Sequence, residues 1–187
     1  LIVLIGLSGL LKLSVDVNMA NFFQPGTEIR DSMDFMDEKM TGTVDIRVRI
    51  EGDMKSPETL EDMVKIQEFM ESQDKISTSF SIANIVQQMH RTVMDDDPAF
   101  ETIPESREKV NNLFTMYSMS GDPEDFSTMI DYGYKVGLVT AFSKMLSTDE
   151  IFEINEAFQT FISNTVNQSN KIDVTGMIVV FRDLVIL

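Results

Sequence analysis

The stretch from Thr43 to Met70 constrains the fold more than any other, because it contains a complete strand, turn and helix. Four apolar residues alternate with charged ones, the period of two that gives a strand one apolar face: Val44, Ile46, Val48 and Ile50. Gly52 and Asp53 then break the strand, and Ser56 stands where a helix N-cap is expected, before Pro57. An apolar stripe at helical spacing follows: Leu60, Met63, Val64 and Met70. The stretch predicts a β-α unit.

A second β-α unit is predicted near the other end of the chain. Alternation marks one face of its strand, made by Val136, Leu138, Thr140 and Phe142. Ser147 and Glu150 have capping-box spacing before a helix whose apolar stripe is Ile151, Ile154, Phe158, Ile162 and Val166. A third element follows each helix, at 75–80 and at 171–181, although the first of these fits an edge strand or a loop. The simplest packing is an α+β, ferredoxin-like (split β-α-β) layer of helices on one sheet.

The residues between the two units predict a helical insertion over 81–132. Its first helix has one apolar face, formed by Ile82, Ile85, Val86, Met89 and Val93. Pro104 is expected to open a second helix, which carries Val110, Leu113, Phe114 and Tyr117. Asp122 and Pro123 are expected to open a short third one, which carries Phe126, Met129 and Ile130.

A further helix is predicted from Thr27, with Gly42 beyond its end as a stop. Its apolar stripe consists of Ile29, Met33, Met36 and Met40. We expect these methionines to lie in an ordinary core; the alternative is a flexible Met-rich face for an apolar cargo. Four phenylalanines are candidates for an apolar cleft or for the core: Phe22, Phe23, Phe100 and Phe126.

Both ends of the chain are strongly apolar. Leu1 to Leu11 is about half of the roughly 20 apolar residues that span a bilayer, and it lacks the parts of a signal peptide. These ends are either core strands or parts of membrane helices, and we favour the second interpretation. Residues 1–12 are then the end of a transmembrane helix, and 177–187 the start of the next membrane segment. A short strand is expected between residues 1–12 and the first helix, at Leu13, Val15 and Val17.

The charge and the composition exclude several classes of function. A formal charge of −16 and a pI near 4.3 argue against nucleic-acid binding, which needs a basic patch, and against attraction to anionic lipid headgroups. The chain has no cysteine, so disulfides, thiolate metal sites and a Cys nucleophile are excluded.

The sequence contains no constellation of residues typical of an active site. The single histidine, His90, has no partner at metal-ligand spacing, and Asp95 to Asp97 precede Pro98 in what we interpret as a solvated turn. No phosphate-binding loop or dinucleotide fingerprint is present. We therefore predict no catalytic, cofactor-binding or metal-binding residue, and we expect the protein not to be an enzyme.

The order of several segments resembles the large extracytoplasmic loop of RND-superfamily exporters of the hydrophobe/amphiphile type, which group with MMPL lipid transporters and, more remotely, with Patched-like proteins. The segments are VDVNMANFFQPGTEIRDSMDFMDEKMTGT, VDIRVRIEGDMKSPETLEDM, SIANIVQQMH, IPESREKVNNLFTMYSMSGDPEDFSTMIDYGY and DVTGM. They cover nearly the whole chain, and their order is more specific than any one of them. One departure is Met40-Thr41-Gly42, where the family usually has Phe-Gly-Gly.

The resemblance implies a porter domain on the extracytoplasmic (periplasmic) side of the cell membrane. Residues 13–80 would form its first β-α porter unit, 81–132 the helical insertion, and 133–176 the second β-α unit that completes the fold. Such transporters export lipids or other hydrophobic or amphiphilic molecules with the proton gradient. Their proton-relay carboxylates lie in the membrane helices, so none is assigned to this chain.

The partners implied are a hydrophobic or amphiphilic cargo and the remaining membrane and outer domains of the same transporter, and the resemblance leaves oligomerisation open. We expect an apolar groove between the β-α layer and the helical insertion. The alternative function is that of a membrane-tethered domain that senses a ligand or binds a protein partner without moving a cargo.

Overall fold

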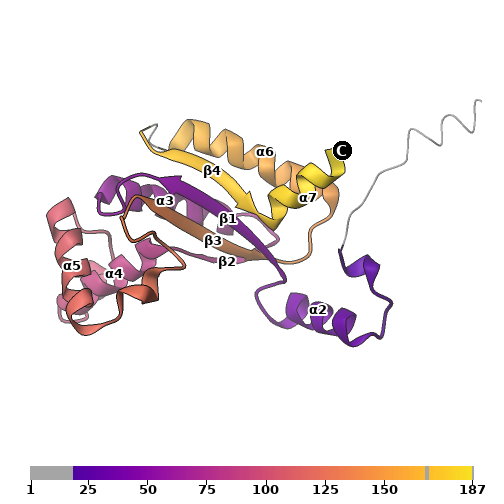
Figure 1. Cartoon of the computed structure of the whole chain (residues 1–187), viewed down its shortest axis with the longest axis horizontal. Helices are drawn as coiled ribbons and strands as arrows, with labels where there is room; N and C mark the ends of the chain where they lie inside the picture. Colours follow the sequence, from indigo (N-terminus) through magenta and orange to yellow (C-terminus); the bar gives the residue numbers. More distant parts are fainter. Residues whose placement is uncertain (1–18, 167–168, 187) are drawn as a thin grey trace, which may run out of the picture.

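The computed structural model describes residues 19–166 and 169–186. Its centre is a four-stranded antiparallel sheet of order β2-β3-β1-β4 (Figure 1). The strands are β1 (Val44–Glu51), β2 (Ile76–Phe80), β3 (Val136–Ser143) and β4 (Lys171–Gly176). Among the described residues, no helix combines the length and the apolar character needed to cross a bilayer.

The connections between the strands produce the predicted ferredoxin-like topology. Helix α3 (Pro57–Glu71) joins β1 to β2, and helix α6 (Thr148–Thr165) joins β3 to β4. Each of these pairs of strands is separated by one strand of the other pair, because β3 lies between β2 and β1, and β1 lies between β3 and β4. The fold is therefore α+β, with two split β-α-β units sharing one sheet, as the sequence predicts.

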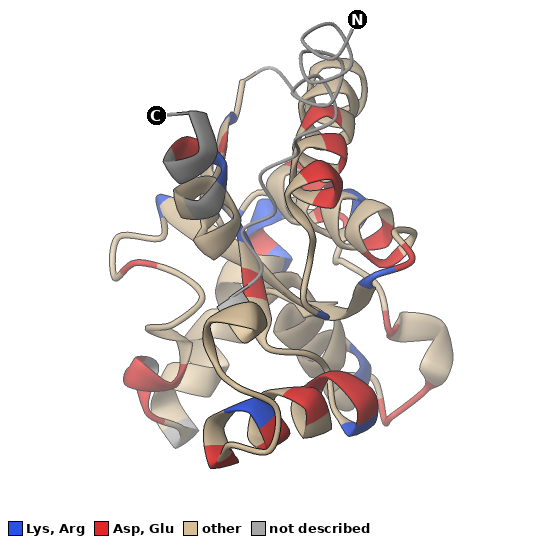
Figure 2. Ribbon diagram, turned by 90° about the vertical axis from the view of Figure 1, so that its right-hand side faces the viewer, with Lys and Arg blue, Asp and Glu red and all other residues tan. Residues whose placement is uncertain are grey.

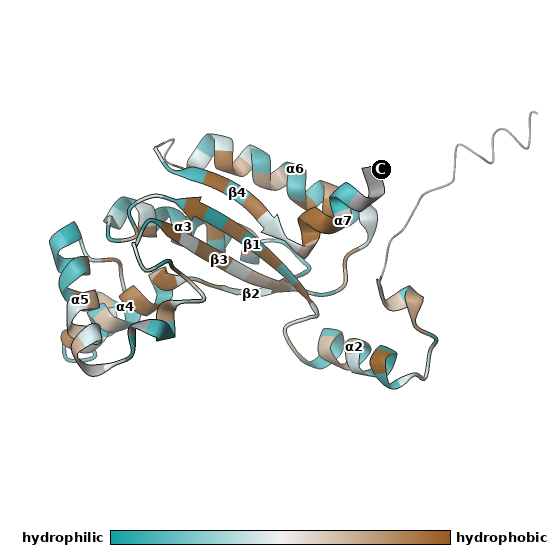
Figure 3. Cartoon of the chain, in the orientation of Figure 1, coloured by the Kyte–Doolittle hydropathy of each residue, from teal (hydrophilic) through white to brown (hydrophobic). Residues whose placement is uncertain are grey.

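The core lies between one face of the sheet and the two crossing helices (Figure 3). The predicted face of β1 is confirmed, since Ile46, Val48 and Ile50 are fully buried. The crossing helices cover it with the apolar residues of their predicted stripes: Leu60, Met63 and Met70 from α3, and Ile151, Ile154 and Phe158 from α6. The capping box of Ser147 and Glu150 is also confirmed. Ser56 lies at the N-cap of α3, but its side chain makes no capping hydrogen bond to the helix.

The predicted core face of β3 is wrong. Of that face only Thr140 is buried, whereas every residue of the opposite parity is buried: Gly137, Val139, Ala141 and Ser143. The register with β1 places these residues beside Ile50, Val48, Ile46 and Val44, and therefore under the helices. Small side chains are required there because Met54 and Met63 occupy the space above Gly137, where an added Cβ would lie 2.5 Å from the sulfur of Met54.

The insertion is helical, as predicted. It consists of α4 (Ile82–Val93), α5 (Arg107–Ser120) and the 3-10 turns η2 (Pro98–Phe100) and η3 (Pro123–Phe126). The expected start of α5 at Pro104 is wrong, because Ser106 is the N-cap and its hydroxyl accepts a hydrogen bond from the N–H of Lys109. The insertion shares the main core through its buried residues, which include Ile82, Val86, Val110, Leu113 and Phe114.

Helix α2 (Glu28–Lys39) follows the 3-10 turn η1 (Met19–Phe22) and stands apart from the sheet (Figure 1). The helix predicted from Thr27 is confirmed, and Thr27 is its N-cap. The expected burial of its stripe is wrong: no residue of α2 is buried, and Ile29 and Met40 are 55% and 58% exposed. The carboxylate of Asp37 attaches α2 to the body by accepting hydrogen bonds from the hydroxyl of Thr43 and the N–H of Met145.

The last described element is helix α7 (Met177–Ile186), which follows β4 directly. The strand expected over 171–181 therefore ends earlier, at Gly176, where a φ of +92° turns the chain. The alternative interpretation of 177–187 as a core strand is wrong, because 177–186 are helical; Ile178, near the start of this helix, is buried in the core. The apolar residues 1–12 and the strand expected at 13–17 lie outside the described residues.

The chain enters and leaves the sheet at the same end. It enters at Val44, and it leaves at Gly176, which lies opposite Ile46 in the neighbouring strand. At the other end of the sheet, Val136 lies opposite Glu51, where the chain returns from the insertion. Figure 1 shows the consequence: α2 and α7 lie at one end of the molecule, and α4 and α5 lie at the other.

Candidate functional site

An apolar groove between α4 and α5 is the candidate site, and it consists of two adjoining hollows. The first hollow has a volume of about 500 Å³ and is lined by Ile85, Gln88, Met89, Thr92, Val93, Leu113, Met116, Tyr117, Asp125, Phe126 and Met129. The second has a volume of about 540 Å³, and its lining includes His90, Met94, Phe100, Ile103, Glu105 and Lys109. Val93, Leu113 and Met116 line both hollows and thus form the divide between them.

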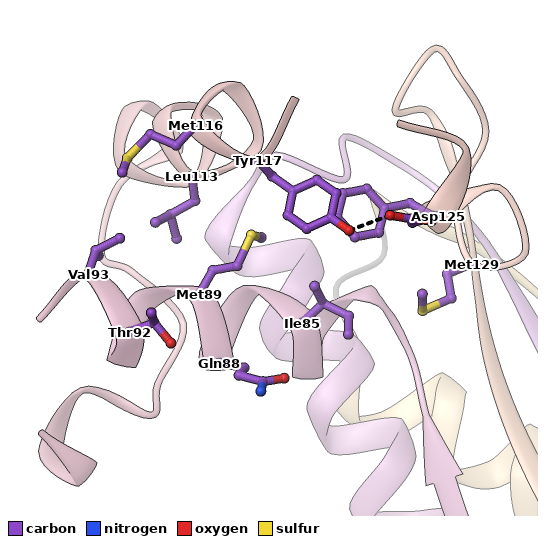
Figure 4. Close-up of a pocket in the computed structure, with 11 residues that line it drawn as sticks. Ile85, Gln88, Met89, Thr92, Val93, Leu113, Met116, Tyr117, Asp125 and Met129 are labelled. Atoms are coloured by element: carbon purple, nitrogen blue, oxygen red, sulfur yellow. Dashed lines mark hydrogen bonds between the residues drawn. The ribbon is translucent and has the colours of Figure 1, made fainter. Parts of the chain in front are cut away.

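The groove lies within the helical insertion, not between the insertion and the β-α layer as expected. The reason is the way in which α4 divides its apolar face. Ile82 and Val86 are fully buried against the main core, whereas Ile85, Met89 and Val93 remain for the first hollow. Figure 4 shows Met89 of α4 and Leu113 of α5 extending toward each other across this hollow.

The start of α4 is held by a network of buried and half-buried polar side chains. The hydroxyl of Ser81 donates to Gln67 Oε1 at 2.8 Å, and Gln67 Nε2 donates to Asn84 Oδ1 at 2.8 Å. The side chains of Ser81 and Asn84 also form a capping box at the start of α4. Because Gln67 belongs to α3, this network fixes the first wall of the groove on the β-α layer.

The loop between β1 and α3 holds the second wall. Asp53 Oδ2 accepts from Arg107 Nε at 2.6 Å, and Lys55 Nζ donates to Asn111 Oδ1 at 2.8 Å. Lys55 Nζ also lies 4.1 Å from the ring centroid of Tyr134. Burial opposes ionisation of Asp53, but the hydrogen bonds from Arg107 and from the N–H of Lys55 hold its pKa below the ordinary value.

One side of the first hollow is closed by Tyr117 and Asp125 (Figure 4). The hydroxyl of Tyr117 donates to Asp125 Oδ2 at 2.5 Å, and this hydrogen bond raises the pKa of Tyr117. The Tyr117 ring lies 4.5 Å from the ring of Phe126, centroid to centroid. It also packs over Gly121, where an added Cβ would lie 2.7 Å from the ring. Of the described residues that line this hollow, Asp125 alone is acidic.

The second hollow contains the single histidine. His90 Nδ1 lies 2.9 Å from the carbonyl oxygen of Thr102, and its ring packs edge-on against Phe100 at 5.6 Å. These contacts attach the loop after η2 to α4. Lys109 in this hollow is paired with Glu105 at 3.7 Å. Within residues 19–166 and 169–186, no group of three or more Asp, Glu or His side chains is arranged to hold a metal ion.

The other residues singled out in the sequence lie at different places. Of the four cleft candidates, Phe126 and Phe100 line the first and second hollows, whereas Phe22 and Phe23 lie near α2 and line neither hollow. Asp95 to Asp97 form an exposed turn, as predicted, and Asp95 and Asp96 have φ of +58°. Acidic positions, drawn red, predominate over basic ones, drawn blue, along the ribbon in Figure 2, in keeping with 31 acidic and 15 basic residues.

No protein-family model matches this chain, and no curated protein matches it. The size of the groove is that of a small-molecule site, and its lining is mainly apolar with a few polar groups at the edges. Such a surface can hold an apolar or amphiphilic molecule.

Proposed function

We propose that this chain is the extracytoplasmic (porter) domain of a proton-driven, RND-type membrane transporter that exports lipids or other hydrophobic or amphiphilic molecules. The observation that carries the proposal is where the chain enters and leaves the sheet relative to the groove. A domain inserted between two membrane segments needs both of its connections on the membrane side. Here the chain enters and leaves the sheet at one end, and the α4–α5 groove lies at the other.

The lining of the groove supports an apolar cargo. Three methionines line the first hollow, Met89, Met116 and Met129, and their unbranched side chains adapt to ligands of different shape. Met116 is 54% exposed, so its side chain can move without opening the main core. A groove of this kind binds ligands through their apolar surface and discriminates little between ligands of different shape.

The contacts of the β1–α3 loop support a role in movement. Asp53 and Lys55 connect the β-α layer to Arg107 and Asn111 at the start of α5. Gln67 of α3 holds α4, so a displacement of the β1–α3 loop relative to α3, caused by membrane helices at the opposite end, would move α5 against α4 and change the width of the groove. Rigid-body movements of this kind are the usual basis of alternating access.

The alternative is a membrane-tethered domain that binds a ligand or a protein without moving it. The observation that favours it is the exposed stripe of α2, where Ile29, Met36 and Met40 remain uncovered. Exposed apolar surface of this kind is typical of a contact with another protein or domain.

The coding sequence on both sides of this domain separates the two functions. The transporter requires several downstream apolar stretches of about 20 residues, with an ionisable residue inside one of them. A single such stretch followed by a signalling domain would contradict the proposal and favour the alternative. In the full-length transporter, Met116→Asp in the groove should abolish proton-driven export of a fluorescent amphiphile, whereas Thr115→Asp on the exposed side of α5 should preserve it.

A further inference from the structure

The first hollow places one carboxylate in surroundings that are otherwise uncharged. Ten of its lining residues are apolar or neutral, and the eleventh is Asp125. Among the residues that the structure describes, no basic side chain lines this hollow and none forms an ion pair with Asp125. A bound cation would therefore find a carboxylate that is not already neutralised.

The groups around Asp125 are suited to a positive charge. The hydroxyl of Tyr117 donates to Asp125 Oδ2 and so holds the carboxylate at the edge of the hollow. The rings of Tyr117 and Phe126 lie beside it, and aromatic faces attract organic cations. Asp122 and Glu124 belong to the same turn and add charge of the same sign. The chain as a whole, at −16, repels an anionic headgroup.

We propose that the α4–α5 groove takes an amphiphile with an organic-cation headgroup, which lies against Asp125 and the ring of Tyr117. The apolar tail extends between Met89 and Leu113 and passes Met116 toward the second hollow. This proposal rests on the proposed function and specifies the class of cargo.

The test compares two probes with the same tail, decyltrimethylammonium and the uncharged decyl maltoside, below their micelle concentrations. Their dissociation constants for the intact chain are measured by titration calorimetry, with circular dichroism confirming that the fold persists. We expect the cation to bind about three- to tenfold more tightly. Asp125→Asn should bring the two affinities close together and leave the binding of decyl maltoside unchanged.

The matched control is Asp74→Asn, which removes the same charge from an exposed turn outside the groove. It should retain the preference for the cation. Equal binding of both probes to the unchanged protein would overturn this inference and leave the proposed function standing. A preference that survives in Asp125→Asn would overturn it too, because the cause would then be the overall negative charge. Binding of neither probe would contradict both proposals.

Discussion

The carboxylate of Asp37 accepts a hydrogen bond from the backbone N–H of Met145 at 2.8 Å, across 108 residues of sequence. It also accepts one from the hydroxyl of Thr43 at 2.9 Å. These two bonds attach α2, a helix without a buried residue, to the start of β1 and to the segment between β3 and α6. The side chain of Asp37 therefore links α2 to two segments of the sheet-and-helix body.

Asp37→Ala should loosen α2 and leave the sheet intact. Loss of both hydrogen bonds to a charged acceptor should lower the free energy of unfolding by about 1–2 kcal/mol. Amide hydrogen exchange in α2 should become faster, while exchange in β1 changes little. Asp34→Ala is the control, because Asp34 pairs only with Arg30 on the same helix. An equal effect of both substitutions would contradict this role for Asp37.

Gly42→Ala should be much more destabilising than Gly26→Ala. Both glycines have a positive φ, of +105° and +82°, so both substitutions introduce backbone strain. At Gly42 an added Cβ would also meet the carbonyl of Ser143, whereas nothing lies within 4 Å of such an atom at Gly26. We expect losses of about 2–4 kcal/mol and about 1 kcal/mol in urea unfolding. Similar losses at the two positions would show that the contact with Ser143 is unimportant.

Met63→Ala should destabilise the fold, and Met36→Ala should not. Met63 is a fully buried residue of α3. Its truncation leaves a cavity that should lower the free energy of unfolding by about 2–4 kcal/mol. Met36 lies on the exposed stripe of α2, so its replacement should change the free energy of unfolding by less than about 0.5 kcal/mol. The measurement is the midpoint of thermal or urea unfolding. A large loss of stability in Met36→Ala would mean that the stripe of α2 is packed against another part of the protein.

The stability of the fold should fall in acid, in part because of Glu150. Hydrogen bonds from the N–H and hydroxyl of Ser147, and the nearby Lys75, hold the pKa of Glu150 below its ordinary value, although burial opposes this. The folded state thus releases this proton more readily than the unfolded state does. The resulting stability is present above the ordinary value of 4.5 and is lost as the pH falls through the folded-state pKa.

Glu150→Gln should therefore lower stability at pH 7 by about 1 kcal/mol, and the difference from the unchanged protein should disappear near pH 3. Urea unfolding at a series of pH values measures this. Glu61→Gln, on the exposed side of α3, should leave the curve unchanged. A difference that persists in acid would show that Glu150 acts by packing and not by charge.

The local β-α pattern could be predicted because its signals lie close together in sequence. In β1 the apolar and charged residues alternate without exception, so the buried face was unambiguous. In β3 both faces carry apolar residues, and the larger ones, Val136 and Leu138, pointed to the wrong face. Which face is covered depends on Met54 and Met63, which fill the space over Gly137 and lie far from it in sequence.

The stripe of α2 was misplaced for a related reason. Helical periodicity shows that an apolar face exists, but it does not show that another element of the same chain covers that face. Much of the groove, in contrast, was contained in the predicted stripes, since Met89, Leu113 and Tyr117 were all assigned to apolar helix faces. Asp125 and the contact between Asp53 and Arg107 were missed, because neither has a periodic signal.

Methyl NMR of methionine can show whether the α4–α5 groove binds an apolar ligand, because methionines line the groove and also lie far from it. The chain, labelled at its methionine methyl groups, is titrated with decyl maltoside below its micelle concentration. We predict saturable shifts of Met89, Met116 and Met129, with little change at Met63 in the core or Met36 on α2. Leu113→Asp should abolish these shifts. Shifts confined to Met36 and Met40, or no saturable shift at any methionine, would contradict a cargo site in the groove.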